Sequence, residues 1–322
     1  MGSRLLLVLS ACLLLVGAAA CRSPQPPSEW SFGIIGDLPY APMEEPQFEN
    51  LIDAMNREDL AFVIHVGDFK GQNDPCADDI YRQRLEQFNR FSHPFIFVPG
   101  DNEWTDCHKP ETPSDPLERL AFLRKVLYPT NRTLGQTTFE LERQSSSPAF
   151  ALFRENSRWS RSGVLFATIH VVGSNDGFGR WPEGDREHSQ RGAANRAWME
   201  AAFRLAAGDR YRALVLVIHG NPRFELTPGD SGRSGFEDFL GSLEAAMLAF
   251  SKPVVLVHGD THYFRIDKPL RNSETRRRIV HLTRVESFGV PDVHWVRATF
   301  QEANPNVFVF DPVLLSTGRE EP

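Results

Sequence analysis

Five short hydrophobic runs along the chain end in polar residues of the same kinds. Four of them end in Gly-Asp, namely FGIIGD, FVIHVGD, FIFVPGD and VVLVHGD, and their last residues are Asp37, Asp68, Asp101 and Asp260. A fifth run, LVLVIHG, ends in His219 and a glycine. Short apolar runs rich in β-branched residues predict buried strands. Segments with apolar residues at helical spacing lie between the runs, so the pattern predicts an α/β protein.

The remaining elements predict how the strands are grouped. We expect helices at residues 45–59, 78–91, 114–128, 195–208 and 236–250. We expect antiparallel strands at residues 147–156 and 162–173, and a tail after residue 260 that is mostly strand. This order predicts one large domain in which two mixed β-sheets pack face to face with helices on the outside. Ligands in such sheets bind beyond the carboxyl ends of the strands, where all five polar ends lie.

The four carboxylates and the histidine predict a metal site at that edge. A single Asp after a strand is often a helix cap or a turn former, which is the alternative interpretation for any one of them. Four buried carboxylates repel each other unless cations lie between them. One or two divalent ions would remove that repulsion. The glycine before each Asp would let the backbone turn sharply beneath the ligand.

Composition and charge narrow the function class. The chain has 322 residues, of which 41% are hydrophobic and 24% charged, as in an ordinary globular protein. Its formal net charge of -7 argues against a surface that coats nucleic acid. The most basic feature, Arg276-Arg277-Arg278, is interpreted as a solvated loop, with a contact for an anionic substrate or surface as the alternative.

The N-terminus has the layout of a secretory signal. Residues 5–20 are uncharged and apolar, follow Arg4, and are too short for a comfortable membrane span. We expect a signal peptide at residues 1–21, a Pro-rich tether at 22–30, the domain at 31–312 and a tail at 313–322. Ala18-Ala19-Ala20 before Cys21 fits simple cleavage and also resembles a bacterial lipobox, in which Cys21 is lipidated. We favour a periplasmic or outer-membrane lipoprotein that touches the membrane only through this anchor, with a secreted protein as the alternative.

Removal of the leader leaves two cysteines in the folded part of the chain, Cys76 and Cys107. An exported protein folds in an oxidising compartment, so a disulfide between them is the default and a pair of free thiols is the alternative. Each cysteine follows a Gly-Asp by a short loop, so the two loops can touch if their strands end side by side.

The motifs together resemble those of the calcineurin-like metallophosphoesterases, from about Phe32 to Asp311. That family has, in order, Asp-x-His, Gly-Asp, Gly-Asn-His-Asp/Glu, a lone His after a strand, and Gly-His-x-His. The segments that take these places are Gly36-Asp37, Gly67-Asp68, Gly100-Asp101-Asn102-Glu103, His219 and Gly259-Asp260-Thr261-His262. The resemblance implies a four-layer sandwich fold and a metal centre at the strand ends.

The resemblance also implies a ligand set. One metal ion would be held by Asp37, Asp68 and His262. The other would be held by Asp68, Asp101, His219 and Asp260, with Asp68 as the bridge. Because this set exchanges histidine for carboxylate, it favours the harder ions Mn²⁺, Mg²⁺ or Ca²⁺ over Zn²⁺ and Fe.

Several positions depart from the family pattern. Pro39 stands where the first His is expected, and Tyr40 beside it could supply an oxygen ligand or simply pack. Asn102 stands in place of the catalytic His, and an amide can donate a hydrogen bond but cannot act as an acid. His65 and His258 lie on strands beside the motifs, and we interpret them, like Glu103, as packed residues or as supports behind the ligands.

Two functions follow from the sequence. The first is a metal-dependent phosphoester hydrolase with a phosphorylated small molecule or a phosphodiester as substrate, in which Asn102 and His219 flank the leaving group. The alternative is a weakly active or inactive protein of the same fold that binds a phosphorylated ligand or a partner at the cell surface. A structural Ca²⁺ site with chemistry elsewhere ranks last, because no Gly-x-Ser-x-Gly motif is present.

Overall fold

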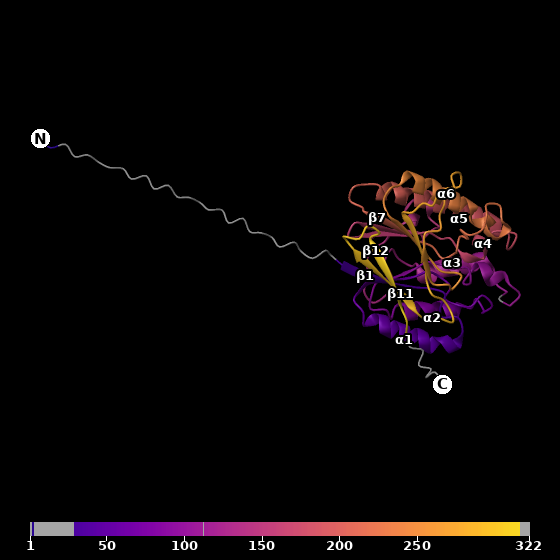
Figure 1. The fold of residues 1–322 in the computed structure, drawn as a ribbon. Coiled ribbons are helices and arrows are strands. Elements are labelled where there is room, and N and C mark those ends of the chain that lie inside the picture. The colour runs from indigo at the N-terminus through magenta and orange to yellow at the C-terminus, as the bar shows by residue number, and fades with distance from the viewer. Residues whose placement is uncertain (1, 3–28, 112, 316–322) are drawn as a thin grey trace, which may run out of the picture.

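The structure is a computed structural model that describes residue 2, residues 29–111 and residues 113–315. Two β-sheets lie at the centre and helices cover their outer faces (Figure 1). The predicted two-sheet α/β architecture is therefore confirmed. The predicted signal peptide, Cys21 and most of the tether lie outside the described residues.

The first sheet has five strands in the order β12-β11-β1-β2-β3. Strands β1, β2 and β3 are parallel, whereas β11 pairs antiparallel with both β1 and β12. The three parallel strands therefore present their carboxyl ends at one edge. The strand bounds are β1 Glu29–Ile35, β2 Leu60–His65, β3 Phe95–Phe97, β11 Trp295–Gln301 and β12 Phe308–Val313.

The second sheet has seven strands in the order β4-β5-β6-β7-β8-β10-β9. Its four central strands, β6, β7, β8 and β10, are parallel, and the outer strands pair antiparallel. The bounds are β4 Glu142–Arg143, β5 Ser157–Arg161, β6 Val164–Thr168, β7 Ala213–Val217, β8 Val254–His258, β9 Arg265–Asp267 and β10 Leu282–Glu286.

The helices form the outer layers because each buries one apolar face. The first three α-helices pack on the five-stranded sheet through residues such as Phe48, Phe88 and Leu123, while α5 and α6 pack on the seven-stranded sheet. The α-helix bounds are α1 Glu45–Asn56, α2 Asp78–Phe88, α3 Pro116–Leu127, α4 Gly173–Asp176, α5 Gly184–Ala206 and α6 Glu237–Ala249. Short 3-10 helices are η1 Pro42–Glu44, η2 Thr105–His108, η3 Gln144–Ser146, η4 Pro148–Phe150 and η5 Ser231–Phe236.

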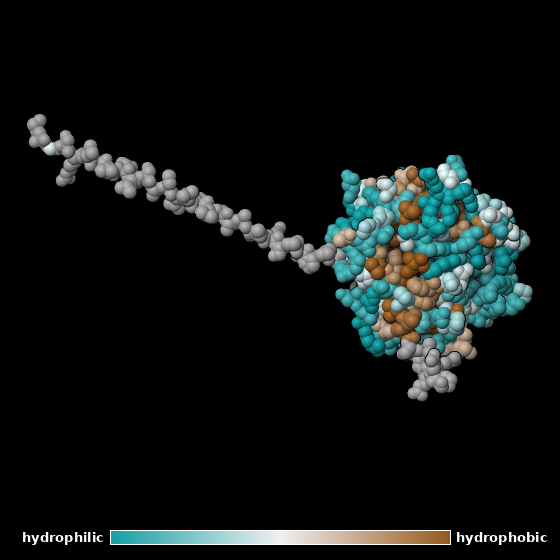
Figure 2. Space-filling view, in the orientation of Figure 1, coloured by the Kyte–Doolittle hydropathy of each residue, from teal (hydrophilic) through white to brown (hydrophobic). Residues whose placement is uncertain are grey.

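A third apolar cluster fills the space between the two sheets. It is rich in aromatic rings, and Phe32, Phe62 and Phe166 pack against one another with centroid distances of 4.9–5.5 Å. The face in Figure 2 is mostly hydrophilic, and its hydrophobic patches lie over the region of β11 and β12 in Figure 1. The apolar cluster between the sheets holds them against each other and so determines the relative position of their edges.

The prediction of a strand at residues 147–156 is wrong. This segment contains η4, and the strand that pairs with β6 begins only at Ser157. Pro148 explains the difference, because proline lacks a ladder N–H and has the φ of a helical turn. Within residues 29–111 and 113–315, no helix combines the length and apolar character that a membrane crossing requires.

Candidate metal centre

The structure brings the predicted polar strand ends together at one edge of both sheets. Asp37, Asp68 and Asp101 follow β1, β2 and β3 of the first sheet, while His219 and Asp260 follow β7 and β8 of the second. Strands β1, β2 and β3 run parallel to one another, as do β7 and β8, so their carboxyl ends open at the shared edge. The convergence predicted from the sequence is therefore observed.

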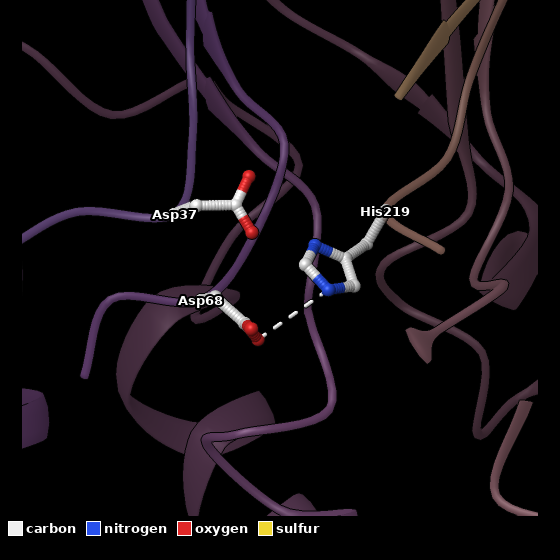
Figure 3. Close-up of side chains that lie close together, drawn as sticks. All are labelled: Asp37, Asp68 and His219. Atoms are coloured by element: carbon white, nitrogen blue, oxygen red, sulfur yellow. Dashed lines mark ion pairs between the residues drawn. The ribbon is translucent and has the colours of Figure 1, made fainter. Parts of the chain in front are cut away.

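Two groups of ligand atoms lie close enough to share a metal ion. The first group is Asp37, Asp68 and His219, which Figure 3 shows pointing toward one another. The second is Asp101, His219 and Asp260. Within each group the ligand atoms all lie within 4.8 Å of one another. His219 belongs to both groups, whereas the sequence motifs placed Asp68 in the bridging position.

The hydrogen bonds of His219 orient its ring toward the carboxylates. Its Nδ1 lies 2.6 Å from the carbonyl oxygen of Val66, which makes Nδ1 the donor. Its Nε2 is 3.0 Å from Asp101 Oδ1 and 3.5 Å from Asp68 Oδ1. With Nδ1–H donating to the backbone, Nε2 is the nitrogen turned toward the two carboxylates, and a metal ion that displaced its proton would find the imidazole correctly oriented.

The backbone at the strand ends is held in a costly conformation. Asp37, Asp68, Asp260 and His262 have φ values of 55°, 58°, 80° and 59°. The left-handed region is uncommon for residues other than glycine, and such strain concentrates at functional sites. It aims successive side chains at the same point beyond the strands.

Among the glycines of the motifs, one has the conformation of the predicted turn and two make room for a ligand. Of the four motif glycines only Gly67 has a positive φ, so at the other three the Asp itself or a later residue makes the turn. A Cβ on Gly100 would lie 2.0 Å from Asp68 Oδ1, and one on Gly259 would lie 2.2 Å from Asp37 Oδ2. Gly100 therefore makes room for a carboxylate of the neighbouring strand in its sheet, and Gly259 for a carboxylate from the other sheet.

Tyr40 and His262 lie next to the first group. The Tyr40 hydroxyl is 3.2 Å from Asp68 Oδ2 and 3.0 Å from His262 Nε2, and that nitrogen is 3.6 Å from Asp37 Oδ1. Nδ1 of His262 lies 2.6 Å from the Val290 carbonyl oxygen, so its Nε2 is turned inward as in His219. The structure thus places the Tyr40 oxygen at the site, where the sequence left a packing role open.

Asn102 and Glu103 lie behind Asp68. The backbone N–H of Asn102 donates to Asp68 Oδ1 at 3.0 Å, and its side-chain amide donates to the Lys70 carbonyl at 3.0 Å. Glu103 Oε1 accepts the backbone N–H groups of Gly100 at 2.6 Å and Asp68 at 3.3 Å. Both residues fix the loops that carry the ligands, and one N–H of the Asn102 amide is left for other partners.

His65 and His258 are fully buried and support the strands. His65 bonds the Leu38 carbonyl at 2.9 Å and the Gly67 N–H at 3.1 Å, while His258 Nδ1 lies 2.8 Å from the Gly259 carbonyl. Burial lowers the pKa of each imidazole to about 3. Both imidazoles are therefore neutral and support the backbone next to the site, in line with the interpretation of the sequence.

The predicted disulfide between Cys76 and Cys107 is present. Each sulfur lies 3.9 Å from the carbonyl oxygen of Asn102. The bridge therefore ties the loop after β2 to the loop after β3, directly beside the residues that follow Asp68 and Asp101. A disulfide in this place fits a protein that folds in an oxidising compartment.

The electrostatics of the cluster show an unmet need for positive charge. In the described part of the chain, Asp37, Asp68 and Asp101 form ion pairs only with His219 and His262, and none with Lys or Arg. Burial raises the pKa of Asp37 and of Asp68 well above its usual range, and raises that of Asp260 to about 6. Burial lowers the pKa of His219, but the facing carboxylates outweigh it and raise that pKa. Divalent ions would satisfy this set of oxygen and imidazole ligands.

Sequence reasoning missed one residue at the site. Ser174 lies in the turn after β6, and its hydroxyl donates to Asp101 Oδ2 at 2.6 Å. The signal was present, because the polar run Ser-Asn-Asp follows a strand just as the Gly-Asp pairs do. A serine among loop residues is too common to single out from sequence alone.

Comparison with solved structures supports the fold assignment. The chain is similar to a dimetal phosphatase from Danio rerio, with a TM-score of 0.55 and 14% identity over 88% of this chain and 96% of that chain. It is also similar to PhoD, with a TM-score of 0.54 and 12% identity over 86% of this chain and 65% of that one. No family model and no curated protein matches the sequence. The chain thus has the calcineurin-like metallophosphoesterase fold that its motifs predict.

Proposed function

We propose that the protein is a metal-dependent hydrolase of phosphoesters. The observation that carries the proposal is the buried cluster of carboxylates and imidazoles, which has no Lys or Arg partner among the described residues. Its fold supports the same conclusion. The proposed ligands are Asp37, Asp68, Asp101, His219, Asp260 and His262.

The chemistry would depend on one or two divalent ions, with Mn²⁺, Mg²⁺ or Ca²⁺ favoured by the oxygen-rich ligand set and Zn²⁺ or Fe as alternatives. Such ions polarise phosphoryl oxygens and lower the pKa of the attacking water. Asp68 and His219 lie at the centre of the cluster, and each faces ligands from both sheets. His219 and His262 would bind a metal ion through Nε2, because their Nδ1–H groups donate to backbone carbonyls.

The leaving side would depend on hydrogen bonding. The remaining N–H of the Asn102 amide can donate to a leaving oxygen, but it cannot deliver a proton at neutral pH. We therefore propose that esters with stable leaving groups, such as aryl phosphates, turn over fastest. The substrate class is a phosphorylated small molecule or a phosphodiester.

The proposal is tested by adding Mn²⁺ to the metal-stripped protein and screening phosphomonoesters and phosphodiesters. Wild-type protein should hydrolyse at least one of them, and Asp68→Ala should lose turnover by more than about 100-fold, since supporting residues alone are worth about 10–100-fold. Asp79→Ala, at a side chain that is 96% exposed on α2, is the matched control and should keep full activity. Unchanged turnover by metal-free Asp68→Ala would sink the proposal.

A non-catalytic binding protein is the second candidate, and Pro39 and Asn102 favour it because they stand where histidines are expected. The variant Asn102→His separates the two functions. In a weak enzyme the new imidazole should raise turnover of esters with poor leaving groups, while in a binding protein it should produce none. Tight binding of a phosphorylated ligand without turnover by either form would establish the second candidate.

Export with a lipid anchor at Cys21 also remains a proposal. The disulfide between Cys76 and Cys107 supports an oxidising compartment. Metabolic labelling with a fatty acid should mark the wild-type chain and leave Cys21→Ala unlabelled. Secretion of unlabelled wild-type protein would instead support simple cleavage.

A further inference from the structure

The turn after β6 has an unusual backbone. Three consecutive residues, Ser174, Asn175 and Asp176, have φ values of 50°, 60° and 55°, and Gly177 follows with 75°. A left-handed conformation is unfavourable for an L-residue, because Cβ comes too close to the following carbonyl oxygen. Three such residues in a row are stable only where the surrounding structure holds them in place.

Buried polar contacts hold this turn from two sides. The Asp176 carboxylate accepts the Val172 N–H at 2.9 Å and an Arg191 N–H at 2.5 Å, and Arg191 also donates to the Asp176 carbonyl at 2.8 Å. Arg191 comes from α5 and is fully buried. The amide of Asn175 bonds Ser234 Oγ at 3.0 Å and the Gly235 N–H at 2.9 Å in η5. The strain is therefore maintained by a fully paired network.

The first two residues of the turn, Gly173 and Ser174, lie against the second ligand group. A Cβ on Gly173 would lie 2.4 Å from Asp101 Oδ1 and equally close to Asp260 Oδ1, so only glycine fits there. The next residue, Ser174, places its hydroxyl 2.6 Å from Asp101 Oδ2. The other oxygen of Asp101, Oδ1, faces His219 Nε2 at 3.0 Å.

We propose that Ser174 is a positioning residue of the metal centre. Its hydroxyl holds the outer oxygen Oδ2 of Asp101, so that Asp101 presents Oδ1 alone, as a monodentate ligand, on the side that faces His219. The inference rests on the metal centre of the proposed function. It goes beyond that function by assigning the role of Asp101 to a hydrogen bond from a strained turn of the opposite sheet.

The residue type supports a role for the hydroxyl rather than for the backbone. A left-handed position is best served by Gly or Asn, and serine gains nothing there from its conformation. A hydrogen bond to a charged oxygen is stronger than one between neutral groups, and this offsets the cost of the conformation. Residues that orient a metal ligand in this way are typically worth about 10–100-fold in metal affinity.

The test compares two readouts in the metal-stripped full chain, the Mn²⁺ affinity by calorimetry and the melting temperature without metal. Ser174→Thr keeps the hydroxyl on a more strained backbone, so its Mn²⁺ affinity should stay within about 3-fold of wild type while its melting temperature falls. Ser174→Ala and Ser174→Gly lack the hydroxyl, and both should bind Mn²⁺ about 10-fold more weakly or worse.

The matched control is Ser162, which also has a positive φ of 48° but lies in the turn between β5 and β6, at the other end of the strands. At both positions the Gly variant should have a higher melting temperature than the Ala variant. Ser162→Ala and Ser162→Gly should leave the Mn²⁺ affinity unchanged. The proposal is overturned if the Mn²⁺ affinities of the Ser174 variants rank in the same order as their melting temperatures and Ser174→Gly binds Mn²⁺ almost as tightly as the wild type. If wild type binds no Mn²⁺, Mg²⁺, Ca²⁺ or Zn²⁺, the proposed function itself fails and this inference with it.

Discussion

At the scale of single residues, the site depends on close packing around the ligands, both within one sheet and between the two sheets. The carboxylates of Asp37 and Asp68 lie against Gly259 and Gly100, so a ligand of one strand is positioned by the absence of a side chain on another. His219 and His262 are oriented by backbone carbonyls, and Asp101 by Ser174. The identity of the ligands is thus only part of what the sequence must specify, because the small residues between them decide the geometry.

The substitution Gly259→Ala tests this packing. Its Cβ would meet Asp37 Oδ2 at 2.2 Å and Val66 Cγ2 at 2.9 Å, so we expect a loss of about 1–3 kcal/mol in the free energy of unfolding together with weaker metal binding. Urea unfolding with and without Mn²⁺ measures both. Gly192→Ala is the control, because nothing lies within 4 Å of its Cβ in the middle of α5, and it should stabilise the protein by about 0.5–1 kcal/mol. An unchanged Gly259→Ala protein would contradict the packing argument.

Tyr40 provides a second test at this scale. Its hydroxyl contacts both Asp68 and His262, so Tyr40→Phe should weaken Mn²⁺ binding by about 10-fold while the fold stays intact. Titration calorimetry measures the affinity, and circular dichroism checks the fold. Tyr263→Phe, at an exposed neighbour of His262, should bind Mn²⁺ like wild type. If Tyr40→Phe binds Mn²⁺ as tightly as Tyr263→Phe, Tyr40 has only a packing role.

At the scale of elements, the sequence predicts strands better than it predicts the loops that carry the chemistry. The runs that end at Asp37, Asp68, His219 and Asp260 are all strands with carboxyl ends at one edge, because uninterrupted apolar runs leave few alternatives. The turn at Ser174 was not predictable, since its left-handed backbone depends on Arg191 and on η5, which are distant in the chain. The strand expected at residues 147–156 failed because Pro148 favours a helical turn there.

The disulfide is the element-scale device that can be tested alone. Replacing Cys76 and Cys107 by Ala opens a loop of 31 residues and should lower the free energy of unfolding by about 3–4 kcal/mol. Because both sulfurs lie beside the Asn102 carbonyl, the Mn²⁺ affinity should fall as well. Urea unfolding of the double variant should match that of dithiothreitol-treated wild type, and dithiothreitol should not change the variant further. A double variant as stable as the oxidised wild type would contradict this role.

At the scale of the whole molecule, the two sheets bring carboxylates to one edge, where these carboxylates repel one another in the folded protein. The pKa of Asp260 is raised to about 6 by burial, and that of His219 is raised as well, because the carboxylates around it outweigh its burial. Groups with raised pKa values stabilise the folded state at low pH, and that stability is lost as the pH rises through the folded pKa. These groups therefore contribute least to the stability of the metal-free protein once the pH has risen above their folded pKa values, where a bound metal helps most.

The raised pKa values predict how the stabilisation by metal changes with pH. Metal ions compete with protons for Asp260 and its neighbours, so the rise in melting temperature on adding saturating Mn²⁺ should be larger at pH 7.5 than at pH 5. Differential scanning calorimetry at the two pH values measures it, with Asp68→Ala as the variant that should show little rise at either. An equal or larger rise for wild type at pH 5 would contradict the assignment of these groups as metal ligands.

The central claim is that the cluster at the sheet edge binds divalent metal and that the protein hydrolyses phosphoesters only with this site loaded. The most direct measurement is a Mn²⁺ titration of the stripped wild-type protein, followed in parallel by calorimetry and by turnover of an aryl phosphate ester. The account predicts that turnover appears with the metal and saturates at the same Mn²⁺ concentration as binding. Turnover that is already complete in the stripped protein, or binding that saturates without any turnover, would contradict it.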